Sequence, residues 1–189
     1  HHVVEVREKD LDDHLEDILS AMDEPFADSS GILVNLLSEF AAKHVKVALS
    51  GDGADELLGG YNKHRGLLRS IQPDWKNKTL KRASGALGVL PSSRNKKSFN
   101  QVRRLQRYSR GLNLNFRERY LEWACFTPEA RVSEILRSHH RYSDSEVMAH
   151  YLDKLNEERF NSVLKTDFSL VLSNDMLCKV DGMSMHRSL

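Results

Sequence analysis

Residues 45–61 read VKVALSGDGADELLGGY, and this stretch decides the expected fold class. Its first five residues are short, valine-rich and bounded by turn residues, as is typical of a strand buried in a parallel sheet. Ser50-Gly51-Asp52-Gly53 follows as a turn, and residues 54–58 can begin a helix that Gly59-Gly60 ends. A strand, a glycine-containing turn and a helix make half of a doubly wound α/β unit, whose ligands lie at the carboxyl end of the strand.

Three carboxylates fall in this turn, at Asp52, Asp55 and Glu56. Glycines let a ligand approach the backbone, and the amides of the turn and of the helix start favour an anion. Carboxylates alone would repel a phosphate, so their presence beside amide donors suggests Mg²⁺ between them and a polyphosphate. The competing interpretation is an acid-rich helix N-terminus, where the helix dipole favours Asp and Glu in any case.

Better-known motifs do not fit this stretch. A Walker A loop needs Gly-Lys followed by Ser or Thr, which is missing, and the dinucleotide fingerprint fails because Glu56 stands where its third glycine belongs. An EF-hand loop fails because Ala54 occupies its second ligand position. Elsewhere, His64 and His186 are interpreted as structural or exposed histidines rather than as ligands.

The rest of the chain suggests a small α/β part that gives way to helices. A second short strand is expected at residues 3–6, and Asp10 is a candidate N-cap for the helix that follows it. No convincing strand follows Lys63. We expect an α/β portion at 1–72, a basic helical or linker region at 73–112 and a helical portion at 113–189, with further helices at 10–22, 32–44, 114–126, 128–136, 145–155 and 161–172.

Two strands cannot make a stable parallel sheet, so strands are missing from these 189 residues. The chain also begins at His1 without Met, which suggests a piece of a longer protein. There is no run of about 18 apolar residues and no signal-peptide pattern. Cys125 and Cys178 are too few for a disulfide framework. We therefore expect a cytoplasmic protein that does not enter a membrane.

The net charge of +1 hides two segregated blocks. Residues 1–30 hold ten acids and two bases, whereas residues 75–117 hold twelve bases and no acid. The basic block could attract phosphates, nucleic acid or an acidic partner, or it could be a solvated helical face with a flexible loop. Trp75, Tyr108 and Phe116 are too few aromatics to interleave with the bases as stacking platforms, which disfavours a nucleic-acid-binding module.

Three segments, taken together, resemble the glutamine-dependent asparagine synthetase family. Residues 50–61 resemble that family's second signature. Residues 23–30, DEPFADSS, are similar to its upstream stretch, and residues 174–189 resemble its D-x-L-x-K-x-D-R-x-S-M segment. The three occur in the family's order and span almost the whole chain.

The resemblance implies an ATP-pyrophosphatase domain of the PP-loop, adenine-nucleotide α-hydrolase-like type. Such a domain activates aspartate as β-aspartyl-AMP with ATP and Mg²⁺, and ammonia from a glutaminase domain of the same full-length chain then displaces AMP. By the family pattern, Ser50 and Gly51 contact the nucleotide, and Asp52 takes part in forming the acyl-adenylate. Asp55, with Glu56, is expected to hold Mg²⁺-pyrophosphate, and Asp55 is the candidate metal ligand.

The last segment also lines the cleft in this family, which makes Lys179 and Asp181 candidate cleft residues. Asp28 is a third candidate, although residues 28–30 fit the capping of a helix better than contact with substrate. Gly182 stands where the family usually has Arg, which puts one anion contact in doubt.

Two features of the family are missing from these residues. There is no N-terminal Cys nucleophile and no S-G-G-x-D-S pyrophosphate motif, so we expect the 189-residue chain alone to be inactive. Exposed apolar surface should favour a dimer or larger assembly. The alternative reading is a related amidotransferase, or an enzyme like β-lactam synthetase, that adenylates another carboxylate.

Overall fold

The computed structural model describes residues 1–22, 24, 26, 28–93, 96–125, 127, 134–135, 145–156 and 159–189. Regular structure within these residues is helical. The chain divides into two compact units, His1–Ala54 with Asp167–Leu189 and Asp55–Thr166. A search of the described residues finds no helix with the length and apolar character that crossing a membrane requires.

The expected doubly wound parallel sheet is not confirmed, because the described residues form no strands. Residues 3–6 and 45–49 carry no strand pairing. Val47 is 77% exposed and Leu49 is 98% exposed, although both were expected in a buried strand. A strand satisfies its backbone groups only through a neighbouring strand, and neither segment has one in the part of the chain described here.

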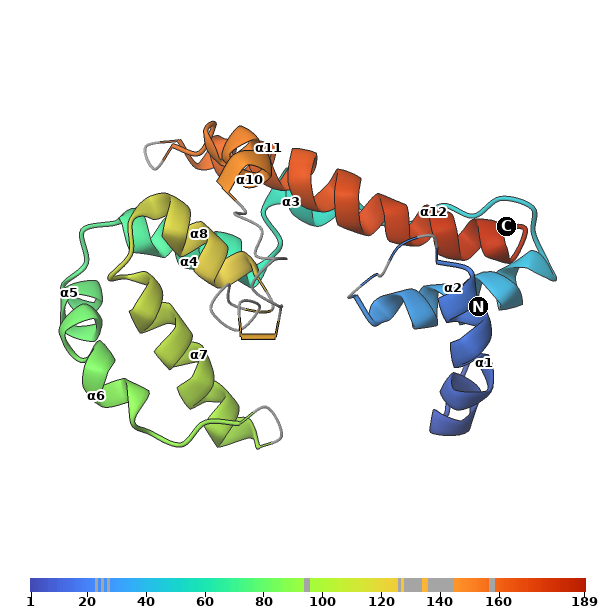
Figure 1. The fold of residues 1–189 in the computed structure, drawn as a ribbon, viewed down its shortest axis with the longest axis horizontal. Coiled ribbons are helices and arrows are strands. Elements are labelled where there is room, and N and C mark those ends of the chain that lie inside the picture. Colours follow the sequence, from blue (N-terminus) through green and yellow to red (C-terminus); the bar gives the residue numbers. More distant parts are fainter. Residues whose placement is uncertain are drawn as a thin grey trace. The chain divides into compact units, whose positions relative to one another are not determined.

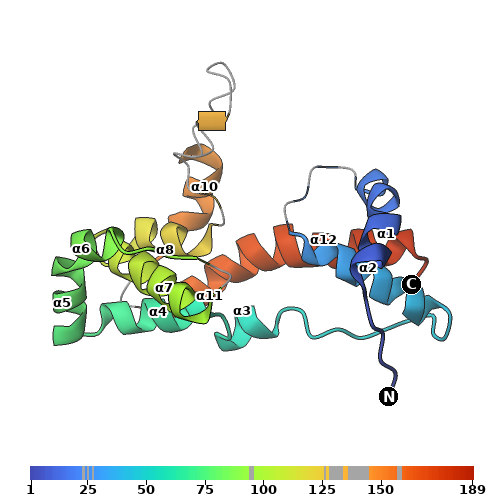
Figure 2. The ribbon, with the colours of Figure 1, turned by 90° about the horizontal axis from the view of Figure 1, so that it is seen from below.

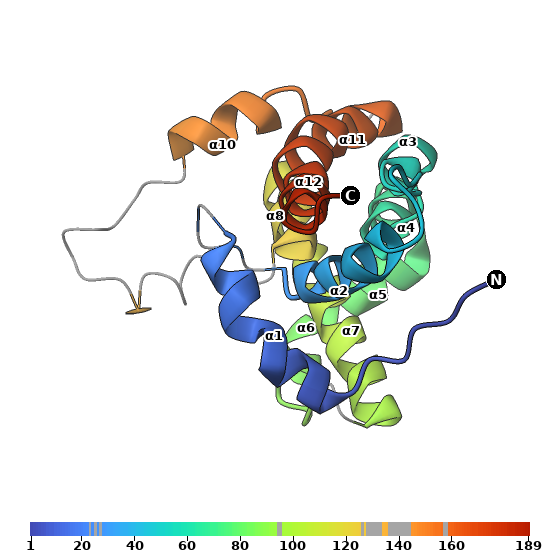
Figure 3. The same ribbon diagram turned by 90° about the vertical axis from the view of Figure 1, so that its right-hand side faces the viewer.

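The first unit is built around the contact of α2 (Ser30–Ala42) with α12 (Leu177–His186). Helix α1 (Glu8–Ser20) also packs against α2, and Figure 3 shows these three helices. The π-helical segment η2 (Phe168–Met176) leads directly into α12. The buried Ile18 and Met183 supply apolar contacts, so segments from both ends of the sequence form this unit.

Helix α1 begins two residues earlier than its sequence pattern predicts. Arg7 is the N-cap and Asp10 takes the third helical position. The Asp10 carboxylate accepts hydrogen bonds from Arg7 N at 2.9 Å and from Arg7 Nε at 3.3 Å. Asp10 therefore closes a capping box from inside the helix instead of serving as the N-cap. These hydrogen bonds, the backbone one first, hold the pKa of Asp10 below its ordinary value.

The second unit is a cluster of short helices. Figures 1 and 2 show α8 (Phe116–Ala124), which contacts α4 (Asn62–Ile71) and α7 (Lys97–Gly111). The others are α3 (Ala54–Leu58), α5 (Trp75–Arg82), α6 (Ser84–Gly88), α10 (Ser145–Leu152) and α11 (Phe160–Asp167). The boundaries between the units fall at the start of α3 and at the end of α11.

A single apolar cluster holds this second unit together. Leu67, Tyr120 and Val163 are completely buried at its centre. Leu152 and Leu155 complete it, and partly buried aromatic side chains pack around it. Because these residues come from α4, α8, α11 and the end of α10, the cluster joins helices that are up to about a hundred residues apart in sequence.

The helices expected from periodicity are largely confirmed. The patterns at 114–126 and 145–155 correspond to α8 and α10. The pattern at 161–172 is helical throughout, but its hydrogen bonding changes to the rarer π form at Phe168. The pattern at 128–136 lies almost entirely outside the described residues.

Candidate functional site

The loop that carries the predicted nucleotide contacts is open. Ser50, Gly51 and Asp52 are all exposed. Apart from its neighbours in the chain, a Cβ on Gly51 would lie more than 4 Å from every atom that the structure describes. Internal packing therefore does not explain the glycine at position 51, whereas the approach of a ligand to the backbone would.

The glycines that follow have structural reasons instead. Gly53 and Gly59 have φ values of +93° and +73°, in the left-handed region that favours glycine. At Gly60 a Cβ would overlap the carboxylate of Asp55. The backbone N–H groups of Gly59 and Gly60 both donate to the Asp55 carbonyl oxygen, at 2.9 and 3.1 Å. These residues terminate α3 and set the position of Asp55.

Asp55 and Glu56 are neighbours in α3 but differ in exposure. The Asp55 side chain is exposed, whereas Glu56 is only 1% exposed. The hydroxyl of Tyr61 donates to Glu56 Oε1 at 2.6 Å. Burial and this hydrogen bond place the Glu56 carboxylate away from solvent, so of the two carboxylates only that of Asp55 is open to a ligand.

An aromatic group next to the end of α3 was not anticipated from the sequence. His64 is completely buried, with its ring centroid 5.3 Å from that of Tyr61 and 5.9 Å from that of Phe160. The Phe160 ring also lies 3.5 Å from the position that a Cβ on Gly59 would take. His64 is thus a structural histidine, as interpreted, and braces the end of α3. The spacing of Tyr61 and His64 by three residues was the available signal.

In the first unit, two of the motif segments meet through Lys179. Its ammonium group donates to Asp28 Oδ2 at 2.7 Å, to Ser30 Oγ at 2.9 Å and to Met176 Sδ at 3.3 Å. The Lys179 side chain is 7% exposed and that of Asp28 is 20% exposed. Gly31 faces this contact, and a Cβ there would lie in ordinary van der Waals contact with Lys179 Cγ, at 3.7 Å.

Asp28 also caps α2. Its Oδ1 accepts from Ser30 N at 2.9 Å, and its Oδ2 accepts from Ser30 Oγ at 2.7 Å. Burial by itself would raise the pKa of Asp28, but the hydrogen bonds from Lys179 and Ser30, with the charge of Lys179, outweigh it and hold the pKa below the ordinary value. Asp28 and Lys179 are therefore engaged with each other. Within the rest of the DEPFADSS motif, residues 23–27, the structure describes only positions 24 and 26.

A second polar link between α2 and the end of α12 was also missed. Asn35 is completely buried, and its Nδ2 lies 3.0 Å from His186 Nδ1. Arg187 Nε donates to Asn35 Oδ1 at 2.8 Å, and Arg187 Nη2 donates to Asp17 Oδ2 at 2.8 Å. The signal was a single asparagine inside the apolar stretch of α2, because a buried amide needs hydrogen-bonding partners.

The remaining predicted cleft residues lie on α12. Asp181 is exposed. Beyond its chain neighbours, a Cβ on Gly182 would lie more than 4 Å from every described atom. Packing against a Cβ therefore does not impose the glycine at this position, where the resembling family usually has arginine.

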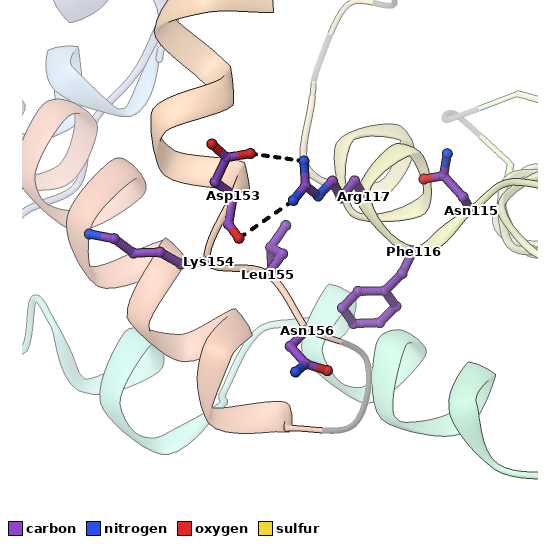
Figure 4. Close-up of a pocket in the computed structure, with 7 residues that line it drawn as sticks. All are labelled: Asn115, Phe116, Arg117, Asp153, Lys154, Leu155 and Asn156. Carbon is purple, nitrogen blue, oxygen red and sulfur yellow. Dashed lines mark hydrogen bonds and ion pairs between the residues drawn. The ribbon is translucent and has the colours of Figure 1, made fainter.

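A pocket of about 530 Å³ lies between α8 and the segment after α10, in the second unit (Figure 4). Arg117 Nη1 donates to Asp153 Oδ1 at 3.0 Å, and Figure 4 shows this arginine directed at Asp153 across the pocket. None of the predicted site residues lines it. Both members of the ion pair are exposed, and such pairs contribute little energy. The pocket thus offers no distinctive chemistry.

The donor set for a metal is limited. Among the described residues, no group of three or more His, Cys, Asp or Glu side chains could hold a metal ion. Mg²⁺ in nucleotide sites, however, is commonly held by one or two carboxylates together with substrate phosphates and water. Asp55 fits that limited role, whereas the buried Glu56 does not.

Comparisons with known proteins agree with the motifs. The chain is 30% identical over 172 residues to "Asparagine synthetase (glutamine-hydrolyzing) 1" of Bacillus subtilis, covering 88% of this chain and 26% of that protein. It is 34% identical over 179 residues to a Mycobacterium tuberculosis protein named "Putative asparagine synthetase (glutamine-hydrolyzing)", covering 93% of this chain and 26% of that protein. This chain spans about a quarter of the length of these relatives.

A Methanocaldococcus jannaschii protein, named "Putative asparagine synthetase (glutamine-hydrolyzing) 2", is 44% identical over 64 residues, which are 34% of this chain and 12% of that protein. No solved structure shows a significant match. The family model for asparagine synthase matches residues 1–189, the whole chain. This chain therefore belongs to the asparagine synthase family.

Proposed function

We propose that this chain forms part of the synthetase domain of a glutamine-hydrolysing asparagine synthetase. Its match to the family over the whole length carries the proposal. The open loop at Ser50, Gly51 and Asp52 supports it, because these are the positions at which the family pattern expects nucleotide contact and adenylate formation. The fold proposed for the complete domain is the PP-loop type, in which residues 45–49 would pair with strands that the described residues do not supply.

The proposed reaction has two steps. The side-chain carboxylate of aspartate attacks the α-phosphorus of ATP, and the bond from that phosphorus to the pyrophosphate leaving group breaks. Ammonia then attacks the acyl carbon of the β-aspartyl-AMP, the bond from that carbon to the phosphate oxygen breaks, and AMP leaves while the nitrogen gives up a proton. The first step requires two anions, the carboxylate and the triphosphate, to be held in line, and both steps develop charge that must be stabilised, which an amide-rich turn followed by a helix start can help to provide.

Within this reaction, Ser50 and Gly51 would contact the nucleotide, and Asp52 would act in forming the adenylate. Asp55 would hold Mg²⁺ together with the nucleotide phosphates, since its carboxylate is exposed. When bound, this ion would neutralise charge on the pyrophosphate leaving group. Glu56 would instead support the loop through Tyr61.

Asp28 and Lys179 would shape the first unit rather than touch substrate, because each already satisfies the other. Asp181 remains the exposed candidate for the cleft. Glutamine would supply the ammonia through a glutaminase domain of the complete protein, in the cytoplasm. An enzyme of the same family that adenylates a carboxylate other than aspartate is the alternative.

The test is pyrophosphate release by the full-length protein with ATP and Mg²⁺, in the presence and absence of aspartate. We expect pyrophosphate release that depends on aspartate. Asp52→Asn should lower the rate of this release at least about a hundredfold, which is the usual cost of removing a key electrostatic group. Asp12→Asn, at an exposed acid of α1, should change the rate little. Release stimulated by another carboxylate, or full activity of Asp52→Asn, would contradict the proposal. The 189-residue chain alone is expected to be inactive.

A further inference from the structure

A strongly cationic pocket of about 400 Å³ lies in the second unit, and none of the residues that line it belongs to the loop at 50–56. Lys63 of α4 and three arginines of α7 line it, and aromatic side chains form its wall. The charged members are Lys63, Arg103, Arg104 and Arg107, and the aromatic ones are Tyr108 and Trp123. None of the described residues that line it is acidic.

Neutral groups hold two of these arginines in place. Arg103 donates from Nε and Nη2 to Asn100 Oδ1, at 3.2 and 2.9 Å. Arg107 donates from Nε to the Glu122 carbonyl oxygen at 2.9 Å and from Nη2 to the Cys125 carbonyl oxygen at 2.7 Å. Amide and carbonyl oxygens orient a guanidinium group without cancelling its charge, so the positive charge remains available to an anion.

Glu122 of α8 lies near the pocket but does not line it. The Glu122 carboxylate forms an ion pair with Arg110, whose Nη2 lies 3.1 Å from Glu122 Oε1. Burial lowers the pKa of Arg107, Glu122 opposes this change, and the charges of Arg103 and Arg110 lower the pKa further. Cations that repel one another in a fixed arrangement are stabilised when an anion binds among them.

The aromatic wall is rigid. Trp123 and Tyr108 stack with ring centroids 5.1 Å apart and planes 13° from parallel. Trp123 Nε1 donates to the Arg107 carbonyl oxygen at 3.0 Å, and the Tyr108 hydroxyl donates to Asn77 Oδ1 at 3.0 Å. Gly66 lets α4 approach the indole, because a Cβ there would lie 3.3 Å from its Cζ3. The pocket is thus preformed, which reduces the ordering cost of binding.

We propose that this pocket binds the phosphate groups of a small molecule. Guanidinium groups match phosphate oxygens in bidentate geometry and carry a permanent charge, which three arginines here supply. A volume of about 400 Å³ lies in the usual range for small-molecule sites and is confined for a long acidic peptide. The proposal does not rest on the asparagine synthetase function.

Calorimetric titration of the full-length protein at low salt tests the proposal, with inorganic tripolyphosphate, ADP and glucose 6-phosphate as separate probes. We expect at least one to bind, and Arg104→Gln to weaken that binding about tenfold or more, as the loss of a charge-assisted contact would. Lys81→Gln removes the same charge from an exposed site on α5 and should change the affinity less than twofold. Circular dichroism confirms that both variants fold.

The pattern across probes identifies the source of the phosphate. Tighter binding of ADP than of tripolyphosphate indicates a nucleotide whose base lies against the aromatic wall, and the reverse order indicates an inorganic or sugar phosphate. The proposal is overturned if no probe binds, if Arg104→Gln and Lys81→Gln weaken binding equally, or if a glutamate-rich peptide of matched charge binds as tightly. Arg104→Gln should leave aspartate-dependent pyrophosphate release unchanged. A negative result for this pocket would therefore leave the proposed function standing, and the reverse also holds.

Discussion

At the scale of single residues, the ammonium group of Lys179 and the carboxylate of Asp28 form a 2.7 Å ion pair across 151 positions of sequence. Both side chains are largely withdrawn from water, and Ser30 completes the hydrogen bonding. A partly buried pair of this kind contributes little over an apolar replacement, but removing one partner leaves the other charge uncompensated. The pair therefore specifies how α12 meets the start of α2.

Lys179→Met tests this contact. We expect the free energy of unfolding to fall by about 1.5–3 kcal/mol, the range for losing hydrogen bonds to a charged group. Lys165→Met, at an exposed position of α11, is the matched control and should change stability by less than about 0.5 kcal/mol. Urea unfolding followed by circular dichroism measures both, and equal stability of the two variants would contradict a structural role for Lys179.

The lowered pKa of Asp28 makes a signed prediction about acid stability. A carboxyl group with a folded-state pKa below its unfolded value of about 3.9 stabilises the fold above that value. This stabilisation is lost as pH falls through the folded-state pKa. The difference in unfolding free energy between the wild type and Asp28→Asn should thus stay constant from pH 7 to 5 and shrink below about pH 4. A difference that shrinks between pH 7 and 5 would be inconsistent with this linkage.

At the scale of elements, the turn before α3 and the turn after it use glycine for different reasons. A Cβ on Gly60 would displace the exposed carboxylate of Asp55, whereas a Cβ on Gly51 would face open space. The first glycine leaves room for the Asp55 side chain. The second leaves the backbone accessible at the point where the proposed nucleotide would bind.

Alanine substitutions separate these two roles. Gly60→Ala should lower the free energy of unfolding by less than about 1 kcal/mol, because the exposed Asp55 side chain can turn away, but it should raise the Mg²⁺ concentration that the full-length protein needs. Gly51→Ala should leave stability within about 0.5 kcal/mol of the wild type while raising the KM for ATP in the full-length protein. Thermal unfolding and ATP-dependence measurements on both variants provide the comparison, and a strongly destabilised Gly51→Ala would show that its glycine serves packing after all.

Local elements were the most predictable part of the fold. The patterns at 114–126 and 145–155 gave helices because apolar spacing and capping act within a few turns. The strands at residues 3–6 and 45–49 could not be judged this way, because strand formation depends on partners distant in sequence. The burial of Glu56 against Tyr61 was not predictable for the same reason, because it depends on how α3 packs.

At the scale of the whole molecule, much apolar surface is exposed on the first unit. Leu37, Val47 and Leu49 are more than half exposed, although their spacing is that of buried residues. Apolar patches of this kind favour association with other surfaces, including a second copy of the chain.

We therefore expect the 189-residue chain to self-associate in solution. Light scattering over a range of concentrations should give a mass of at least two chains, and the double substitution Val47→Ser with Leu49→Ser should shift it towards one. Lys46→Ser, next to Val47 in the chain, removes a charged side chain instead of an apolar one and is the control. A mass of one chain at every concentration would contradict the prediction.

The sequence by itself determined the family, the glycine-containing loop at 50–61 and most of the helices, because these depend on residue identity and on short-range backbone preferences. Only the tertiary structure decided which side chains meet. It joined Lys179 to Asp28 and hydrogen-bonded Asn35 of α2 to Arg187. It also gathered four cations around the Tyr108–Trp123 stack. The physical reason is that hydrogen bonds and charges act over a few ångströms, whereas sequence separation does not determine which residues come that close.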